Sequence, residues 1–148
     1  MTNGPRAALF ILYFEAITNI AAGVVFMAVP AFFAGPFLGQ AFTPSSVEMG
    51  RWYGVTLFIM SAMQLAVLQG RDRRTMRWVL LAMLSGDILQ IGVAFHSLRL
   101  APATVLTATA AIVLSVIYAL ARVVWLRSAD RVSSRADALP AQAHVSSI

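Results

Sequence analysis

The chain has 148 residues, of which 59% are hydrophobic and 11% are charged, and its net charge is +5. Soluble domains carry about 25% charged residues, so this composition excludes a soluble enzyme and a disordered polar protein. All 11 basic residues are arginines that flank apolar blocks, a pattern typical of membrane anchoring. We therefore expect a lipid bilayer as a partner, and no nucleic acid.

Four apolar blocks are long enough to cross a bilayer, which takes about 20 helical residues. In chain order they cover residues 7–29, 51–69, 78–96 and 102–126. Helix is the expected conformation, because lipid cannot satisfy open backbone groups. The sequence thus predicts an all-α, multi-pass integral membrane protein, with a four-helix transmembrane bundle over residues 1–127.

The segments outside these blocks carry their own signals. Residues 45–48 (SSVE) resemble a capping box, which predicts that the second helix begins near Ser46. Residues 30–40 are aromatic and broken by glycine and proline, so we expect a loop or a short interfacial helix there. The tail, residues 128–148, is rich in serine and alanine, and we expect it to be disordered and cytoplasmic.

The distribution of arginines predicts the orientation. The loop between the second and third blocks and the segment after the fourth are arginine-rich, whereas the other two loops contain only Arg51 and Arg99. By the positive-inside rule, both termini are expected in the cytoplasm and the protein in the cytoplasmic (inner) membrane. The arginines behind this prediction are Arg6, Arg71, Arg73, Arg74, Arg77, Arg122, Arg127, Arg131 and Arg135.

Polar residues inside the blocks fall at similar depths. Taking about 1.5 Å per residue, Glu15 lies about 12 Å and Asp87 about 13 Å from the predicted cytoplasmic end, and Gln64 about 9 Å. Two of them have polar neighbours on the same helix face, Asn19 four residues after Glu15 and Gln90 three residues after Asp87. The sequence predicts that these polar stripes meet inside the bundle.

The two acids are the candidate catalytic residues. If Glu15 and Asp87 face each other in low dielectric, they are expected to share a proton, which suits acid–base chemistry, proton relay or cation binding. The alternative is a purely structural role, in which the two acids only join helices by hydrogen bonds, as is expected of Asn19, Gln64 and Gln90. Asn19, Gln64 and Gln90 are also candidate binding residues, together with Arg51 at the start of the second span.

Arg51 opens the segment Arg51-Trp52-Tyr53-Gly54. One reading is an arginine that extends outward to the interface beside two aromatic belt residues. The other is an arginine that turns inward to neutralise a carboxylate or an anionic headgroup. Gly50 and Gly54 form a G-x-x-x-G pattern, which favours close helix contact.

The run Gly23, Pro30, Gly35 and then residues 51–54 (RWYG) resembles small bacterial four-helix membrane proteins, the DoxX-like group and neighbouring families of unknown function. The likeness covers about residues 8–95 and implies a four-helix fold without implying an activity. The third block departs from it at Asp87 and Gln90. A second resemblance is to small multidrug resistance transporters, also short four-helix proteins, whose coupling carboxylate Glu15 would match. This chain is longer, has a second acid at Asp87 and lacks their aromatic and glycine signature.

Three functional hypotheses follow. The first is a non-enzymatic component that binds a lipid-like molecule or a membrane partner, with a hydrophobic small molecule and a second copy of the chain as candidate ligands. The second is a membrane-embedded isomerase or cyclase that uses Glu15 and Asp87 as acid and base. The third is a small proton- or cation-coupled transporter. No cysteine is present and the two histidines lie far apart, so we expect neither a metal site nor a cofactor.

Overall fold

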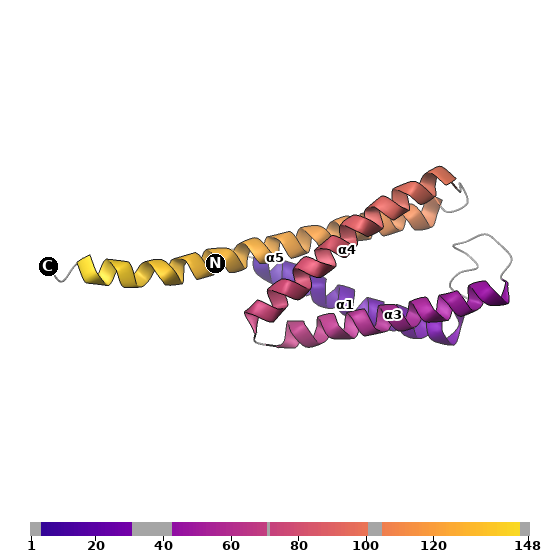
Figure 1. Cartoon of the computed structure of the whole chain (residues 1–148), viewed down its shortest axis with the longest axis horizontal. Helices are drawn as coiled ribbons and strands as arrows, with labels where there is room; N and C mark the ends of the chain where they lie inside the picture. Colours follow the sequence, from indigo (N-terminus) through magenta and orange to yellow (C-terminus); the bar gives the residue numbers. More distant parts are fainter. Residues whose placement is uncertain (1–3, 31–42, 71, 101–104, 146–148) are drawn as a thin grey trace.

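The computed structural model describes residues 4–30, 43–70, 72–100 and 105–145. These residues form four helices and no strand, which confirms the all-α prediction (Figure 1). Most of residues 30–40, for which a loop or short interfacial helix was predicted, lies outside the described ranges. The helices are α1 (Gly4–Ala28), α3 (Pro44–Gln69), α4 (Arg73–Leu100) and α5 (Val105–Val145).

Each helix contains a segment long and apolar enough to span a membrane, at Gly4–Ala28, Pro44–Gln69, Arg73–His96 and Val105–Ala129. The second begins at Pro44, close to the predicted helix start near Ser46 and earlier than residue 51, where the predicted span begins. The capping box that starts it also differs from the predicted one, since the Thr43 hydroxyl accepts from the Ser46 amide at 3.2 Å. Proline suits the first helical position, where its missing N–H leaves no hydrogen bond unmade.

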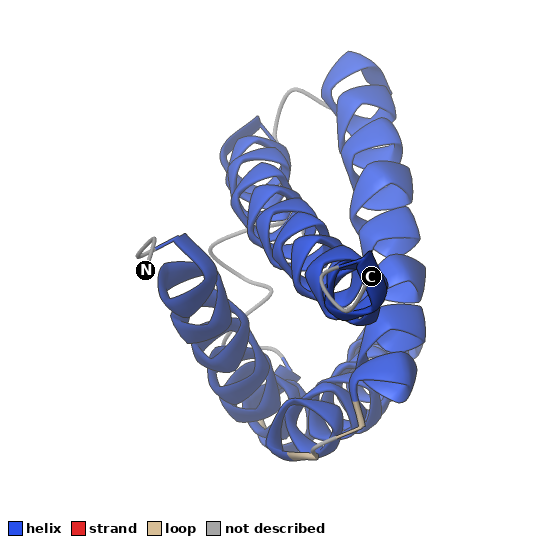
Figure 2. Ribbon diagram, turned by 90° about the vertical axis from the view of Figure 1, so that its left-hand side faces the viewer, coloured by secondary structure: helices blue, strands red, loops and turns tan. Residues whose placement is uncertain are grey.

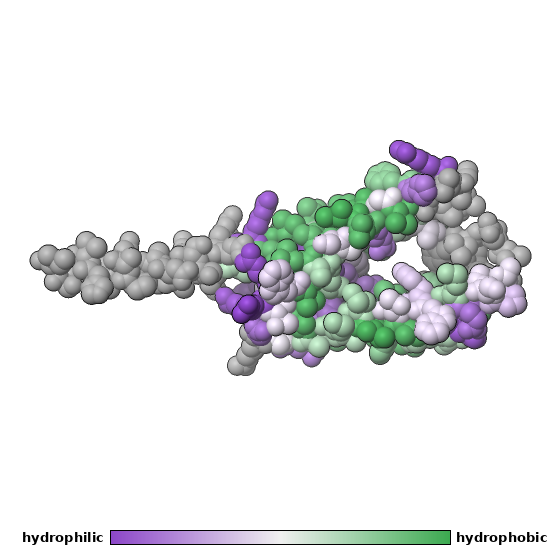
Figure 3. All heavy atoms as spheres, viewed as in Figure 1, coloured by the Kyte–Doolittle hydropathy of each residue, from purple (hydrophilic) through white to green (hydrophobic). Residues whose placement is uncertain are grey.

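The four helices are arranged as two pairs, α1 with α3 and α4 with α5. The pairs meet where α1 and α4 begin and α3 ends, and they separate toward the opposite end (Figures 1 and 2). The separation remains when all side chains are drawn (Figure 3). We call the end where the pairs meet the joined end.

The hydrophobic core lies at the joined end. It combines residues from the start of α1 and α4 with residues from the end of α3 and from α5 near the end of its span. Apolar burial between the two pairs is thus concentrated in one half of the bundle. The buried members are Ala8, Leu12, Leu68, Met76, Leu80, Ala121 and Trp125.

Glycines hold α1 and α3 together away from the joined end. A Cβ atom on Gly54 would lie 2.8 Å from the Gly23 carbonyl oxygen and 2.9 Å from the Met27 nitrogen, closer than real Cβ atoms approach. Gly50 faces Pro30 on the same seam. The predicted close contact of the Gly50–Gly54 face is therefore confirmed, and its partner is α1.

The chain turns from α3 into α4 at Asp72, which caps the α4 N-terminus. Its carboxylate accepts from the Arg74 amide at 2.9 Å and from the Thr75 hydroxyl. The Thr75 hydrogen bond, followed by that of Arg74, holds the pKa of Asp72 below its usual value. A negative charge at this position also complements the positive end of the helix dipole.

Helix α5 is much longer than its span and continues to Val145. The structure therefore describes residues 128–145 as helix, where the sequence led us to expect a disordered tail. The alanines and arginines of this segment are good helix formers, and the preceding span supplies a helical turn on which further turns add without a new nucleation step.

Replacing glycine by alanine should have opposite effects on stability at Gly54, which is in close contact with α1, and at Gly92, which is not. Gly54→Ala places a methyl group against the backbone of α1, and overpacking of this kind costs about 1–3 kcal/mol. Gly92→Ala, on α4, meets no atom within 4 Å and should raise stability by about 0.5–1 kcal/mol, because alanine loses less backbone entropy in a helix. Denaturant unfolding in detergent measures the free energy of unfolding of both variants. Equal shifts of this free energy would contradict a close contact between Gly54 and α1.

Candidate functional site

A buried arginine joins three of the four helices. Arg122 of α5 donates through Nη2 to Glu15 Oε1 of α1 at 2.6 Å, and through Nη1 to Asp87 Oδ2 of α4. Only 1% of Arg122, 3% of Glu15 and 8% of Asp87 is exposed. The guanidinium thus forms ion pairs with two carboxyl groups inside the membrane-spanning region.

The fourth helix contributes an amide. Gln64 of α3 donates through Nε2 to Glu15 Oε2 at 2.9 Å and to the Leu12 carbonyl oxygen at 3.1 Å. Both Glu15 oxygens are therefore engaged, one by an arginine and one by a glutamine. We call Glu15, Gln64, Asp87 and Arg122 the polar cluster; each helix supplies one member.

The cluster adjoins the hydrophobic core on every helix. Along α1 and α4 it follows the core residues Leu12 and Leu80, and along α5 Arg122 immediately follows Ala121. Farther from the joined end, α1 and α3 are in close backbone contact at Gly23 and Gly54. In the polar cluster, hydrogen bonds and ion pairs link all four helices.

Charge and hydrogen bonding in the cluster are not fully balanced. Two carboxyl groups face one guanidinium, so one negative charge is in excess when all three are ionised. Within the described part of the chain, two buried atoms lack a hydrogen-bond partner, Gln64 Oε1 and Arg122 Nε. Buried charges and unpaired polar atoms are costly in low dielectric. This cost lowers the net contribution of the cluster to the stability of the fold.

The predicted site residues divide into two groups. Glu15, Gln64 and Asp87 come together, as their similar depths predicted. Asn19 is half-buried and has no hydrogen bond to the cluster among the described residues, and Gln90 is exposed on α4. Helix spacing placed these two one turn from the acids, which does not by itself bring them into the hydrogen bonds of the cluster.

Arg51 also lies apart from the cluster. It pairs with Glu48 at 2.6 Å, and half of its side chain is exposed. Its neighbours Trp52 and Tyr53 are 72% and 53% exposed. Of the two readings of Arg51, the geometry matches the outward interfacial one, because its charge is already paired on its own helix three residues away.

Glu15 and Asp87 meet at one centre, as predicted, but through Arg122 and not by direct contact; that they share a proton stays a prediction. The guanidinium of Arg122 stands between them and bonds to each. The two acids are drawn together by a common cation, since like charges at close range repel in a low-dielectric interior.

Arg122 is the site residue that sequence reasoning missed. It was counted among the cytoplasmic arginines because it lies close to the end of the fourth block. Two signals could have found it: it lies inside the predicted span, and it continues a buried face with Ala108 and Ser115 at intervals of seven residues.

Among the described residues, no group of three or more histidine, aspartate and glutamate side chains is close enough to hold a metal ion. The cation within the cluster is supplied by the chain itself, as the guanidinium of Arg122.

Comparison of the chain with protein-family models, with curated proteins and with solved structures gave no significant match. The resemblance to DoxX-like proteins therefore stays a prediction. What can be said of function rests on the geometry of the polar cluster.

Loss of Arg122 should destabilise the fold far more than loss of an exposed arginine on the same helix. Arg122→Met leaves two buried carboxyl groups without their cation, and breaking a buried pair costs about 3–5 kcal/mol. Arg127→Met, the matched control, removes an exposed arginine and should change stability by less than about 0.5 kcal/mol.

The measurement is unfolding in detergent. Adding Asp87→Asn to the Arg122→Met variant removes one unpaired charge. The double variant should therefore recover part of the stability that Arg122→Met alone loses. Equal stability of the two single arginine variants would show that the ion pairs do not hold the helices together.

Proposed function

We propose that the protein binds a lipid-like molecule at the polar cluster, and that the polar group of this molecule donates a hydrogen bond to Asp87. The observation that carries the proposal is the charge balance: two carboxyl groups share one guanidinium inside a membrane span. A ligand that donates a hydrogen bond or brings a positive charge offsets the remaining negative charge, whereas an anionic ligand adds to it.

Asp87 is the member of the cluster that a ligand would reach. Its side chain is 10% exposed, against 4% for Glu15 and 1% for Arg122. Its Oδ2 atom is bonded to Arg122, while Oδ1 accepts no hydrogen bond from the described residues. A long-chain alcohol or amine would place its polar group at Oδ1 and its hydrocarbon chain along the apolar helices.

The separation of the helix pairs supports this mode of binding. Away from the joined end, α1 and α3 diverge from α4 and α5 (Figure 1), and a gap remains when the side chains are drawn (Figure 3). A hydrocarbon chain that entered between the pairs from the membrane would lie beside apolar side chains, with the cluster at the closed end. Ligand sites with apolar walls and a few polar groups that fix orientation are the common kind in proteins.

We also propose that the protein lies in the cytoplasmic membrane with both termini in the cytoplasm. Arg122 is buried and no longer counts as a cytoplasmic charge, yet the asymmetry of exposed arginines remains. By the positive-inside rule the joined end then faces the cytoplasm. The exposed arginines at this end, among the described side chains, are Arg6, Arg73, Arg74, Arg77 and Arg127.

Proton-coupled transport is a second candidate, and the charge balance favours it too, because a proton on one carboxyl group would neutralise the cluster. An isomerase or cyclase is less well supported. Its acid and base would have to reach the substrate, whereas both oxygens of Glu15 and one of Asp87 are bonded within the cluster. A second copy of the chain as partner stays a prediction.

Photo-crosslinking of the purified protein in bilayers tests the binding proposal. Three photoactivatable probes with the same chain are compared: a long-chain alcohol, a long-chain amine and a fatty acid. The alcohol and the amine should label the protein and be displaced by unlabelled alcohol, and the fatty acid should label it least. Asp87→Leu should reduce labelling about tenfold, because a hydrogen bond to a charged group contributes about 1.5–3 kcal/mol.

The matched control is Gln90→Leu, which removes an exposed polar side chain from the same helix and should leave labelling unchanged. A preference for the fatty acid, or equal labelling of the two leucine variants, would contradict the proposal. Uptake of the amine probe into vesicles only under an imposed proton gradient would favour the transporter instead.

A further inference from the structure

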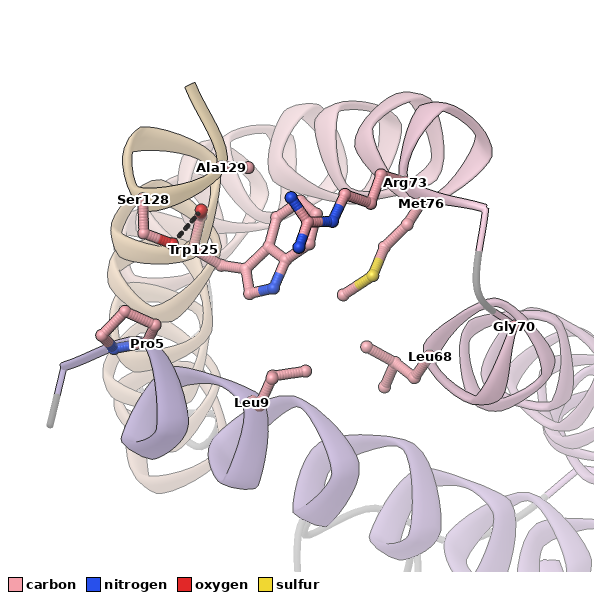
Figure 4. A pocket seen from close by; sticks show the side chains of 9 residues that line it. All are labelled: Pro5, Leu9, Leu68, Gly70, Arg73, Met76, Trp125, Ser128 and Ala129. Atoms are coloured by element: carbon pink, nitrogen blue, oxygen red, sulfur yellow. Dashed lines mark hydrogen bonds between the residues drawn. The ribbon is translucent and has the colours of Figure 1, made fainter. Parts of the chain in front are cut away.

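A cavity opens at the joined end of the bundle. Its volume is about 490 Å³, and all four helices contribute to its wall. Leu9, Leu68, Met76 and Trp125 point into it from α1, α3, α4 and α5, and the side chain of Arg73 reaches across it (Figure 4). We call it the terminal cavity.

Part of the wall of the terminal cavity is formed by firmly packed apolar side chains. Leu68, Met76 and Trp125 are only 6–8% exposed and belong to the hydrophobic core. The hydroxyl of Ser128 is occupied by the Trp125 carbonyl oxygen at 2.7 Å. The cavity therefore offers a ligand both apolar and polar surface, and the one charged residue in its lining is Arg73, which is exposed.

The cavity lies at the ends of the candidate membrane spans, where the membrane surface is expected. It lies where α1 begins, α3 ends, α4 begins and the span of α5 ends. A site at this height meets both the headgroup region and the first methylene groups of the lipid chains. A water-soluble ligand would leave the apolar side chains of the wall without favourable contacts.

The electric field at this end favours an anion. Five exposed arginines surround it, and the one acid there among the described side chains is Asp72, whose carboxylate is engaged by Arg74 and Thr75. Basic pockets between membrane helices near the cytoplasmic side are known sites for anionic lipid headgroups. Guanidinium groups bind phosphate through paired hydrogen bonds.

We propose that the terminal cavity binds one anionic phospholipid of the adjoining leaflet. The phosphate is bonded by Arg73, and the upper part of an acyl chain lies against Leu9, Leu68, Met76 and Trp125. A volume of 490 Å³ is within the range of about 300–1,000 Å³ that small-molecule sites occupy, and it accommodates part of a lipid while the rest stays in the bilayer.

This site is independent of the polar cluster. Leu12 and Leu80, which are 0% and 1% exposed, lie between the two along α1 and α4. The terminal cavity also prefers a negative ligand and the polar cluster a hydrogen-bond donor. The proposal does not rest on the function proposed above, and each has variants that leave the other site intact.

Tryptophan quenching by brominated lipids tests the proposal on the full chain in phosphatidylcholine vesicles. Trp52 and Trp78 are 72% and 65% exposed and would be quenched by any lipid, so both are replaced by phenylalanine, which leaves Trp125 alone. Brominated phosphatidylglycerol should quench Trp125 saturably and more strongly than brominated phosphatidylcholine at the same mole fraction.

The arginine variants identify the site. Arg73→Gln should reduce the preference for phosphatidylglycerol about tenfold, as expected for a lost hydrogen-bonded charge, while Arg73→Lys, which keeps the charge but not the paired hydrogen bonds, should keep part of it. The matched control is Arg74→Gln, which alters the neighbouring arginine outside the cavity wall and should keep the preference. An unchanged Trp125 emission maximum shows that a variant is folded.

Three results would overturn the proposal. The first is equal quenching by the two brominated lipids. The second is an equal loss in the Arg73→Gln and Arg74→Gln variants, which would indicate a diffuse surface charge. The third is displacement of phosphatidylglycerol by glycerol phosphate in solution, which would make the ligand a soluble phosphate ester. Labelling of the polar cluster by the alcohol probe should be the same in all these variants.

Discussion

A guanidinium group within a membrane span has to be neutralised and hydrogen-bonded by the protein itself, because lipid offers neither charge nor acceptor. In this chain two carboxyl groups on two other helices meet that demand. Arg122 bonds to Glu15 and Asp87, and Gln64 completes the layer through Glu15. Since every helix supplies one member, the depth and rotation of all four are constrained at one level.

The rest of the architecture follows from where this constraint acts. The α1–α3 pair is held by backbone contact at Gly23 and Gly54, which is the kind of packing that small residues allow in membranes. Between the pairs, the ion pairs of the polar cluster and the hydrophobic core next to it lie toward the joined end. The pairs therefore separate on one side of the polar cluster, and on the other side they enclose the terminal cavity between their ends.

The sequence predicted the class, the four spans and three of the four cluster residues, because these follow from apolar block length and from depth along a helix. It could not predict the partner of the acids. Arg122 near a span end is equally compatible with a surface anchor, and only the packing of α5 against α1 and α4 decides between these positions. In the same way, Gln90 shares a helix with Asp87 but is exposed.

Solid-state NMR of the labelled protein in bilayers tests the central ion-pair arrangement most directly. Dipolar contacts are measured between the guanidinium nitrogens of Arg122 and the side-chain carboxyl carbons of the acids. Contacts to both Glu15 and Asp87, with none from Arg127, are the predicted result. An Arg122 guanidinium that shows contacts to water or lipid phosphate and to neither carboxyl carbon would contradict the account.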